Sequence, residues 1–217
     1  MKVLNLYACL GGNRLLWSGC EVTAVELDAD LAKMYQERFP NDTVIIGDAH
    51  EYLLQNYKNF DFIWSSPPCP SHSKIRTLRK DNDCFVPVYP DMQLWQEIIF
   101  LQKMFKGKFC VENVISYYEP FLPAQKRGRH LFWCNFKLPQ ILTRRTCPKI
   151  RVKDKRLEAQ QLKDLSDFHN FDFSLYKGSQ RKIKIARNLI DYQVGKTIFD
   201  AAMKIYKKKS DNQLSLF

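Results

Sequence analysis

Cys69 stands directly after an apolar stretch, in the sequence DFIWSSPPCPSHS of residues 61–73. Pro67, Pro68 and Pro70 surround it, and each proline fixes its own φ and lacks a backbone N–H donor. A cysteine held rigidly where a buried segment ends can act as a nucleophile, provided that its thiol loses a proton before or during attack. The alternative role is that of a small buried hydrophobe, which is common for a free cysteine.

A carboxyl group accompanies this thiol, because Glu112 closes another apolar stretch, GKFCVENV at residues 107–114. A thiolate and an acid together suit a pyrimidine ring. The thiolate adds to C6, the acid protonates or hydrogen-bonds N3, and C5 becomes carbanion-like and can accept a methyl group. The pair therefore indicates methyl transfer to C5 of a pyrimidine.

A third group of residues is typical of a nucleoside site. Gly11 and Gly12 follow the first apolar segment, and Glu26 ends the second, where a carboxylate can bind both hydroxyls of a ribose. The sequence ACLGGN is not the spaced glycine pattern that cradles a pyrophosphate, so a cofactor without phosphates, such as S-adenosylmethionine, fits better. The alternative is an ordinary turn with Glu26 as a surface cap.

The elements that must position these groups alternate along the chain. Asn13 is a possible N-cap for a helix over 13–19, and residues 71–90 form a long loop of the kind that is usually functional. Strands are expected at 2–8, 21–27, 42–48, 60–66, 107–114 and 130–136, and further helices at 28–39, 49–57, 91–105 and 190–209.

This alternation predicts an α/β fold whose sheet is mostly parallel, with helices on both faces. In such sheets ligands bind at the carboxyl ends of the strands. The glycine pair, Glu26, Asp48, Cys69 and Glu112 each follow or end a predicted strand. They should therefore gather at one edge.

Composition narrows the class of protein. The chain of 217 residues has a net charge of +11 and is 45% hydrophobic, which fits one globular domain with a polyanionic partner, most often nucleic acid. A solvated lysine-rich surface is the alternative to a nucleic-acid partner.

The 7 cysteines are scattered, so neither a disulfide framework nor a metal site is expected. Without a signal peptide or an apolar span, a cytoplasmic, nucleoid-associated protein is expected.

Taken together, these motifs resemble the cytosine-C5 DNA methyltransferase family. Pro67-Pro68-Cys69 matches its nucleophile motif, Glu112-Asn113-Val114 its acid motif, and Gln125-Lys126-Arg127-Gly128-Arg129 its arginine motif. The sequence QVGKTI at 193–198 loosely matches the start of its closing helix. The resemblance implies a Rossmann-like fold dependent on S-adenosylmethionine, with S-adenosylhomocysteine as product. It also implies a covalent cysteine adduct on a cytosine flipped out of double-stranded DNA, as in restriction-modification enzymes.

The chain departs from the family in three places. Cys9 replaces a glycine of the first motif, Lys196 replaces an asparagine, and residues 137–183 leave room only for a reduced target-recognition segment. Expected domains are therefore a catalytic core at 1–136, that segment, a closing helix at 184–207 and a flexible tail at 208–217.

The resemblance and the strand-end placement assign roles to individual residues. The catalytic residues are Cys69, Glu112, Arg127 and Arg129. The cofactor-binding residues are Tyr7, Ala8, Leu10, Gly11, Gly12, Glu26, Leu27, Asp48, Ala49, Pro67 and Gly195. The DNA contacts are Ser71, Ser73, Lys74, Arg76, Asn113, Gln125, Arg144 and Arg145, and His72 is either a base or an ordinary loop histidine.

The last five residues suggest a protein partner. Gln213, Leu214, Ser215, Leu216 and Phe217 resemble the peptide by which bacterial replication proteins dock into the β sliding clamp, with Leu216 and Phe217 as apolar anchors and Gln213 as a polar register contact. The alternative is that this tail folds onto its own core. For the whole chain, the alternatives to a monomeric DNA methyltransferase are the same chemistry on RNA or a free nucleotide, or an inactive DNA-binding module.

Overall fold

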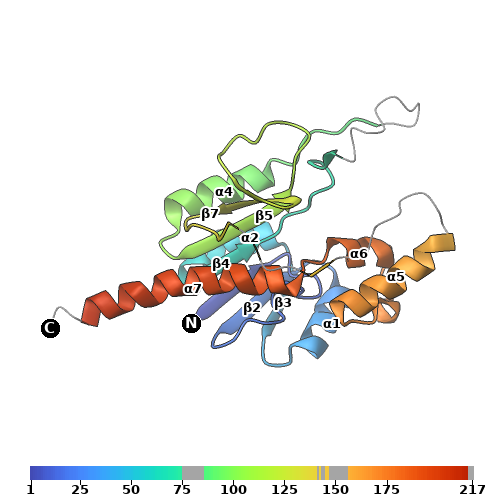
Figure 1. Cartoon of the computed structure of the whole chain (residues 1–217), viewed down its shortest axis with the longest axis horizontal. Coiled ribbons are helices and arrows are strands. Elements are labelled where there is room, and N and C mark those ends of the chain that lie inside the picture. Colours follow the sequence, from blue (N-terminus) through green and yellow to red (C-terminus); the bar gives the residue numbers. More distant parts are fainter. Residues whose placement is uncertain (75–85, 141, 143–144, 147–155, 215–217) are drawn as a thin grey trace.

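The computed structural model describes residues 1–74, 86–140, 142, 145–146 and 156–214, without the side chains of 156–157 and 205–214. Within this part, seven strands form one sheet in the order β3-β2-β1-β4-β5-β7-β6, with helices on both faces (Figure 1). Strands β1 to β5 are parallel to one another, and the β5–β7 and β7–β6 pairs are antiparallel. The predicted α/β fold with a mostly parallel sheet is confirmed.

The six predicted strands and four of the predicted helices are present, with bounds shifted by a few residues. The strands are β1 (Lys2–Leu6), β2 (Glu21–Glu26), β3 (Thr43–Ile46), β4 (Phe62–Ser65), β5 (Lys108–Val114), β6 (Gln125–Arg127) and β7 (His130–Cys134). The helices are α1 (Ala29–Arg38), α2 (Ala49–Asn56), α4 (Gln93–Met104), α5 (Arg156–His169), α6 (Lys182–Asn188) and α7 (Tyr192–Leu214), with 3₁₀ turns η1 (Tyr57–Asn59) and η2 (Phe173–Leu175). None of these described helices is both long and apolar enough to cross a membrane.

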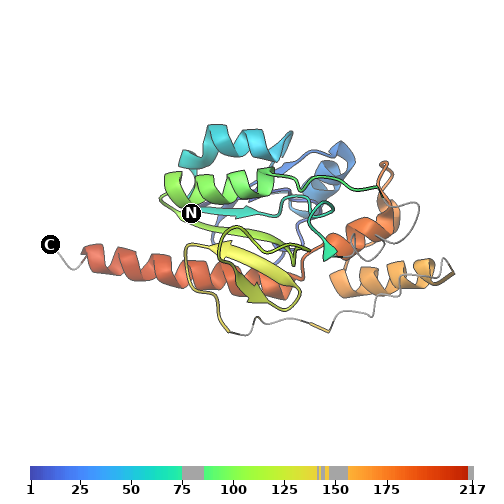
Figure 2. The same ribbon diagram turned by 90° about the horizontal axis from the view of Figure 1, so that it is seen from above.

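The sheet divides the apolar core in two, because successive side chains of a strand point to opposite faces. Leu4 and Ile63 pack with α2 and α4 on one face. Val3 and Trp64 pack with α7 on the other face. Figure 2 shows α2 and α4 on one side of the strands and α7 on the opposite side. Both faces of the central strands are thus buried, and this packing fixes the positions of the strand ends that carry the site residues.

The structure differs from the sequence prediction before β2. Residues 12–16 form turns instead of starting a helix over 13–19. Trp17 explains this path, because its indole stacks on Phe199 of α7 with ring centroids 5.1 Å apart, and its Nε1 donates to the carbonyl of Gly195 at 3.2 Å. A buried indole anchored on another helix overrides the local helix propensity of this segment.

A second difference lies in the expected target-recognition segment, for which no helix was predicted. Residues 156–188 fold into α5, η2 and α6, which lie side by side at the end of the molecule opposite the C-terminus (Figures 1 and 2). Leu165 and Ile183 of this helical unit pack with Leu31 of α1. The hydroxyl of Tyr176 also donates to Oδ2 of Asp28 at 2.7 Å. The helical unit is thus attached to the strand end that Asp28 follows.

A third difference concerns the C-terminal region. Helix α7 continues to Leu214, past the end predicted at residue 209 and into the range expected to be a flexible tail. The side chains of Gln213 and Leu214, and the whole of Leu216 and Phe217, lie outside the part that the structure describes. The clamp peptide therefore stays a prediction from sequence.

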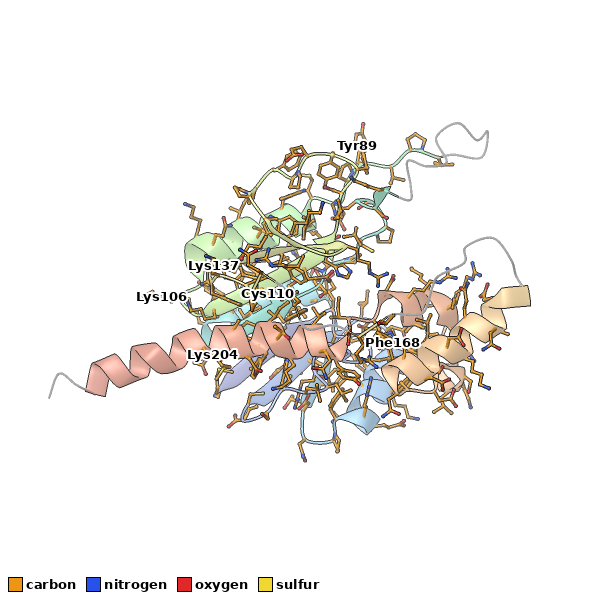
Figure 3. The ribbon with its side chains drawn as sticks, viewed as in Figure 1. Tyr89, Lys106, Cys110, Lys137, Phe168 and Lys204 are labelled. Atoms are coloured by element: carbon orange, nitrogen blue, oxygen red, sulfur yellow. The ribbon has the colours of Figure 1, made fainter. Side chains whose placement is uncertain are left out.

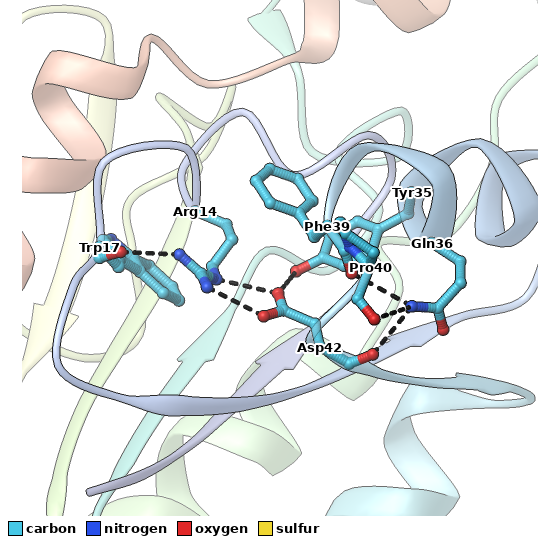
Figure 4. A network of polar contacts seen from close by, with 7 residues as sticks. All are labelled: Arg14, Trp17, Tyr35, Gln36, Phe39, Pro40 and Asp42. Carbon is cyan, nitrogen blue, oxygen red and sulfur yellow. Dashed lines mark hydrogen bonds and ion pairs between the residues drawn. The ribbon is translucent and has the colours of Figure 1, made fainter.

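Asp42 is the centre of a polar network that joins α1 to the turn after β1 (Figure 4). Its two carboxylate oxygens accept from Nε and Nη2 of Arg14, each at 2.9 Å, and Oδ2 also accepts from the hydroxyl of Tyr35 at 2.9 Å. Arg14 extends the network by donating from Nη1 to the carbonyl of Trp17 at 2.8 Å. Because Asp42 is buried, this bidentate ion pair is largely shielded from solvent.

Replacing Asp42 with alanine should lower the free energy of unfolding by about 3–5 kcal/mol, because it leaves the Arg14 guanidinium and the Tyr35 hydroxyl without their acceptor. Urea denaturation followed by circular dichroism measures the loss. Glu37→Gln, which removes an exposed carboxylate from the adjoining helix α1, serves as the control and should change stability little. A loss below ~1 kcal/mol for Asp42→Ala would contradict the network's structural role.

Candidate functional site

A cleft of about 1760 Å³ opens at the carboxyl edge of the parallel strands. Strand order reverses between β1 and β4, the point at which α/β sheets bind ligands. Pockets for a single small ligand hold roughly 300–1,000 Å³, so this cleft has room for two ligands side by side. The opposite wall comes from the helical unit, including Lys184 and Arg187 of α6.

Most of the predicted site residues line this one cleft. The lining includes the predicted catalytic residues Cys69, Glu112, Arg127 and Arg129. It also includes the predicted cofactor residues Tyr7, Ala8, Gly12, Glu26, Leu27, Asp48, Ala49 and Pro67. Of the predicted DNA contacts, Ser73, Lys74, Asn113 and Arg145 line it, whereas Arg76 and Arg144 lie outside the described residues.

Cys69 is a half-buried free thiol just beyond β4. Burial raises the pKa of this thiol, the nearby carboxyl of Glu112 raises it further, and the ammonium of Lys184 opposes the shift. The amides of His72 and Ser73 donate to the Cys69 carbonyl at 3.0 and 3.1 Å, so a tight turn fixes its backbone. At neutral pH the sulfur is therefore a thiol, which must lose its proton as it attacks.

Glu112 lies within β5, where it is buried and opposes Phe132 of β7. Burial raises the pKa of its carboxyl to about 7, against the hydrogen bond from Ser66 and the positive charge of Arg129. The Nε2 atom of His130 lies 3.6 Å from its Oε1. Burial, and then the charge of Arg129, lower the pKa of His130 to about 4. A neutral imidazole thus adjoins an acid that is partly protonated at neutral pH.

Asn113 joins the ends of the two catalytic strands. Its Nδ2 donates to the carbonyl of Pro67 at 3.0 Å, and its Oδ1 accepts from the amide of Val114 at 2.9 Å. This buried amide sets the position of the Pro67-Pro68-Cys69 turn relative to β5. The structure therefore gives Asn113 a positioning role, and its contact with DNA stays a prediction.

The two arginines of the predicted motif have different surroundings. Arg127 donates from Nε to the carbonyl of Pro139 at 2.6 Å and from Nη2 to that of Leu138 at 3.1 Å. Gln125 braces the same segment, because Leu138 donates its amide to Gln125 Oε1 at 2.8 Å. Arg129 instead is exposed and acts electrostatically on Glu112. Gln125 and Arg127 thus order the chain after β7, and the DNA contact of Gln125 stays a prediction.

The cofactor half of the cleft is organised by Glu26. Its Oε2 accepts from the amide of Cys9 at 2.8 Å, and its Oε1 accepts from the amide of Asp28 at 2.9 Å. Burial raises the pKa of this carboxyl, although these backbone hydrogen bonds oppose the shift. Each oxygen has a further lone pair, so the carboxylate can hold the loops after β1 and β2 and still accept from a ribose.

Two apolar side chains beside Glu26 are exposed without an evident packing reason. Leu27, at the end of β2, is 71% exposed, and Ile46, at the end of the neighbouring β3, is 62% exposed. They offer apolar surface to the base of a nucleoside. The described chain also reaches β2 from β1 without a helix, so it lacks the helix N-terminus that binds a pyrophosphate after a first strand. These residues fit a nucleoside cofactor without phosphates.

The glycines of this region have packing roles. A Cβ on Gly11, whose φ is +65°, would lie 2.4 Å from the ring of Phe39. One on Gly195 would lie 2.2 Å from the carbonyl oxygen of Asn13, so the start of α7 approaches the turn after β1 at backbone distance. Leu10 is buried with the helical unit. Gly11, Gly195 and Leu10 are thus packed against protein groups and lie outside the cleft lining, and their cofactor contacts stay predictions.

Cys9 occupies the position where the resemblance implies a glycine. Its φ of +48° lies in the left-handed region, which costs an L-residue roughly 1–2 kcal/mol. Burial raises the pKa of its thiol to about 12, so it is unreactive at neutral pH. Tyr7, two residues earlier, also has a positive φ, +56°. Strain concentrated in one short loop is typical of functional sites.

Several of the other predicted contacts bind protein groups. Ser71 accepts through Oγ from the amide of Asp91 at 3.0 Å, which closes the base of the long loop. His72 is buried, with Nδ1 2.6 Å from the hydroxyl of Tyr118, so it is an ordinary packed histidine. The guanidinium of Arg145 lies 3.9 Å from the ring centroid of Phe168 and ion-pairs with Asp191. Phe168 is labelled on α5 in Figure 3. Protein groups thus hold Arg145, and its contact with DNA stays a prediction.

The sequence prediction missed three residues that the structure brings to the site. His130 follows the arginine motif directly and reaches Glu112. Lys184 lines the cleft from α6. Glu97 is a buried charge on α4, and its spacing from Leu94 and Leu101 puts it on the apolar face of the predicted helix. That misplaced charge was a signal available in the sequence.

A comparison with known protein families identifies the first half of the chain. Residues 1–117 match the sequence model of the C-5 cytosine-specific DNA methylase family. No curated protein matches the chain in sequence. In structure it is similar to the methyltransferase EhMeth of Entamoeba histolytica, with a TM-score of 0.53 at 10% identity over 95% of this chain and 98% of that one. At this identity the likeness shows the fold.

Two other solved structures cover about half of this chain. DNMT2 of Spodoptera frugiperda is 23% identical over 52% of this chain and 35% of its own length, with a TM-score of 0.39. The PH0226 protein of Pyrococcus horikoshii is 26% identical over 52% of this chain and 49% of its own, with a TM-score of 0.36. The chain therefore spans at most about half of the length of these two proteins.

Proposed function

Because the chain belongs to the C-5 cytosine-specific DNA methylase family, we propose that it methylates C5 of cytosine in double-stranded DNA through a covalent adduct on Cys69. The cofactor is S-adenosylmethionine, which supplies an electrophilic methyl group. The observation that supports the proposal most is that Cys69 and the acid Glu112 line the same cleft as Glu26. The nucleophile Cys69 and the acid Glu112 can thus contact a cytosine, while Glu26 contacts the ribose of a cofactor bound beside it.

In the proposed reaction, Cys69 loses its proton as Sγ bonds to C6 of the cytosine, and the electrons of the C5–C6 double bond shift toward C5. Glu112 donates its proton to N3 and stabilises the negative charge that develops on the ring. C5 then takes the methyl group, and the bond between that group and the cofactor sulfur breaks, which releases S-adenosylhomocysteine. Finally C5 loses its proton to water, the S–C6 bond breaks and the double bond re-forms. N3 returns its proton to Glu112, and the released thiolate of Cys69 takes a proton from water, which restores both side chains.

Access to C6 requires that the cytosine leave the base stack, because its ring is covered in a duplex. We propose that the helical unit and the cations along the cleft hold the backbone of such a flipped nucleotide. Lys74 and Arg129 line the cleft on the catalytic side, and Lys184 and Arg187 line it on the side of α6. Contacts from these side chains to phosphates would set affinity and register without reading sequence.

Methyl transfer by the purified protein tests this proposal. With labelled S-adenosylmethionine, duplex DNA should take up label at cytosine, and structured RNA and free dCTP should not. Label on RNA alone would move the assignment to an RNA methyltransferase with the same chemistry. Label in none of the three would favour the inactive DNA-binding module, provided that S-adenosylhomocysteine binding shows a folded cofactor site.

The C-terminal peptide supports a second, separate proposal. We propose that Gln213–Phe217 docks the enzyme to a bacterial β sliding clamp, because this pattern combines two apolar anchors with a polar register residue at the end of a charged segment. Surface plasmon resonance with purified clamp should detect the full chain and lose the signal when residues 213–217 are removed. Equal binding by both chains would reject the peptide as the docking element.

A further inference from the structure

A buried carboxylate lies beneath the cleft and takes no part in the proposed chemistry. The side chain of Glu97, on α4, is 0% exposed. Charged side chains are rarely buried to this degree unless they are paired and hydrogen-bonded, because leaving water costs several kcal/mol. The hydrogen bonds that compensate this burial should therefore be important to the structure around Glu97.

Three donors from three different segments converge on Glu97. The hydroxyl of Tyr7 donates to Oε1 at 2.5 Å, and the hydroxyl of Ser65 donates to Oε2 at 2.6 Å. The Nδ1 atom of His50 lies 3.1 Å from Oε1. Burial and the charge of Glu97 raise the pKa of Tyr7 far above its usual range, so its hydroxyl keeps the proton that it donates.

Each of these partners belongs to a segment that forms the cleft. Tyr7 follows β1, has a φ of +56° and lines the cleft. Ser65 is the last residue of β4, only a few residues before Cys69. His50 lies in the first turn of α2, directly after Asp48 and Ala49 of the cleft wall. One carboxylate thus connects the cofactor loop, the strand that leads to the nucleophile and the helix beside Asp48.

We propose that Glu97 is a positioning residue, whose hydrogen bond to Tyr7 holds the strained loop after β1 in the conformation that binds S-adenosylmethionine. The inference takes only the identity of the cofactor, S-adenosylmethionine, from the proposed function. Tyr7 occupies a left-handed conformation that an L-residue otherwise avoids, so an external restraint must maintain it. The Tyr7–Glu97 hydrogen bond is such a restraint, and it ties the loop to a helix that packs in the core.

Glu97→Gln tests the proposal. Glutamine keeps the shape of the glutamate side chain but replaces one carboxylate oxygen with an NH₂ group, which cannot accept the hydrogen bond that Tyr7, His50 or Ser65 donates there. Calorimetric titration with S-adenosylhomocysteine should show affinity weakened by roughly tenfold or more, at a temperature where the variant stays folded. Tyr7→Phe, which removes only the hydroxyl, should weaken binding by about threefold to tenfold, in line with one lost hydrogen bond. The double variant should bind no more weakly than Glu97→Gln, because both changes break the same contact.

Glu51→Gln, at an exposed site on α2, is the matched control and should bind like the wild type. A role in packing alone would lower the melting temperature of both site variants and leave affinity within twofold, which would overturn the proposal. If Glu97→Gln fails to fold, unchanged affinity in Tyr7→Phe would overturn it equally. The titration does not involve DNA, so the inference stands or falls separately from cytosine methylation.

Discussion

Replacing Cys69 with alanine should abolish methyl transfer, with a loss of at least about 10³-fold in turnover. Alanine cannot form the bond to C6, and without that bond C5 of cytosine lacks the electron density to attack a methyl group. Affinity for S-adenosylhomocysteine should change by less than about twofold, because the change removes a single atom that the cofactor does not need. Labelled methyl transfer and calorimetric titration measure the two quantities on the same preparation.

A trapping experiment separates covalent catalysis from a mere packing role of the thiol. Duplex DNA that carries 5-fluorocytosine cannot lose a proton from C5 after methyl transfer, so the S–C6 bond should persist and the protein–DNA adduct should survive denaturation. The wild type and Cys20→Ala, whose altered thiol lies apart from the cleft lining, should both form this adduct. An adduct with Cys69→Ala would show that another residue is the nucleophile.

Replacing Glu112 with glutamine should have the second-largest effect, a loss of roughly 10²–10⁴-fold in single-turnover rate. Glutamine can still hydrogen-bond N3 but cannot give it a proton as the ring becomes negative. Asn113 and the β5–β7 pairing remain in place, so the variant should keep the fold and the turn before Cys69. Activity above about a tenth of wild type would contradict the role of Glu112 as the acid.

The pH profile gives this prediction a second readout. The reaction needs Glu112 protonated and the Cys69 thiol ionised, and the pKa of Glu112, about 7, lies below that of a thiol raised by burial. The wild-type rate should therefore climb with pH to about 7 and then level off, because thiolate is gained as fast as acid is lost. In Glu112→Gln the rate should keep rising beyond pH 7 until the thiol titrates.

The same carboxyl should make stability depend on pH. Because the folded pKa of Glu112 is raised from 4.5 to about 7, the folded state binds the proton more tightly than the unfolded chain. Its contribution is fully present below pH 4.5 and is lost as pH rises through 7, at a cost of ~3 kcal/mol. Glu112→Gln should flatten this part of the stability curve, which urea denaturation across pH 4–9 would measure.

The sheet and its edge were predictable because strands buried on both faces read as continuous apolar runs. FDFIWSS and GKFCVENV are such runs, and each places a reactive side chain where or near where its strand ends. Parallel strands bring those ends to one edge, so residues far apart in sequence could be grouped correctly. Cys69, Glu112 and Glu26 were found in this way, and they share the cleft.

The packing of the helical unit escaped prediction for a physical reason. Its apolar residues, such as Leu165, Phe173 and Ile183, come from three elements and are buried against Leu31 of α1, far away in sequence. The 14 residues of α5 do carry an apolar helix face, with Leu162 and Leu165 three positions apart, but the sequence does not show what covers that face. The partners of Gln125 and Arg145 were hidden similarly, because their hydrogen bonds go to backbone groups and to Asp191, which only the folded chain brings near.

Nucleoside mass spectrometry tests the central claim most directly. The wild type and Cys69→Ala would be expressed in a host without cytosine methylation, and its DNA and RNA digested separately. The proposed function predicts 5-methylcytosine in DNA from the wild-type culture and none with Cys69→Ala. 5-Methylcytosine confined to RNA, or equal amounts with both proteins, would contradict covalent methylation of DNA cytosine by Cys69.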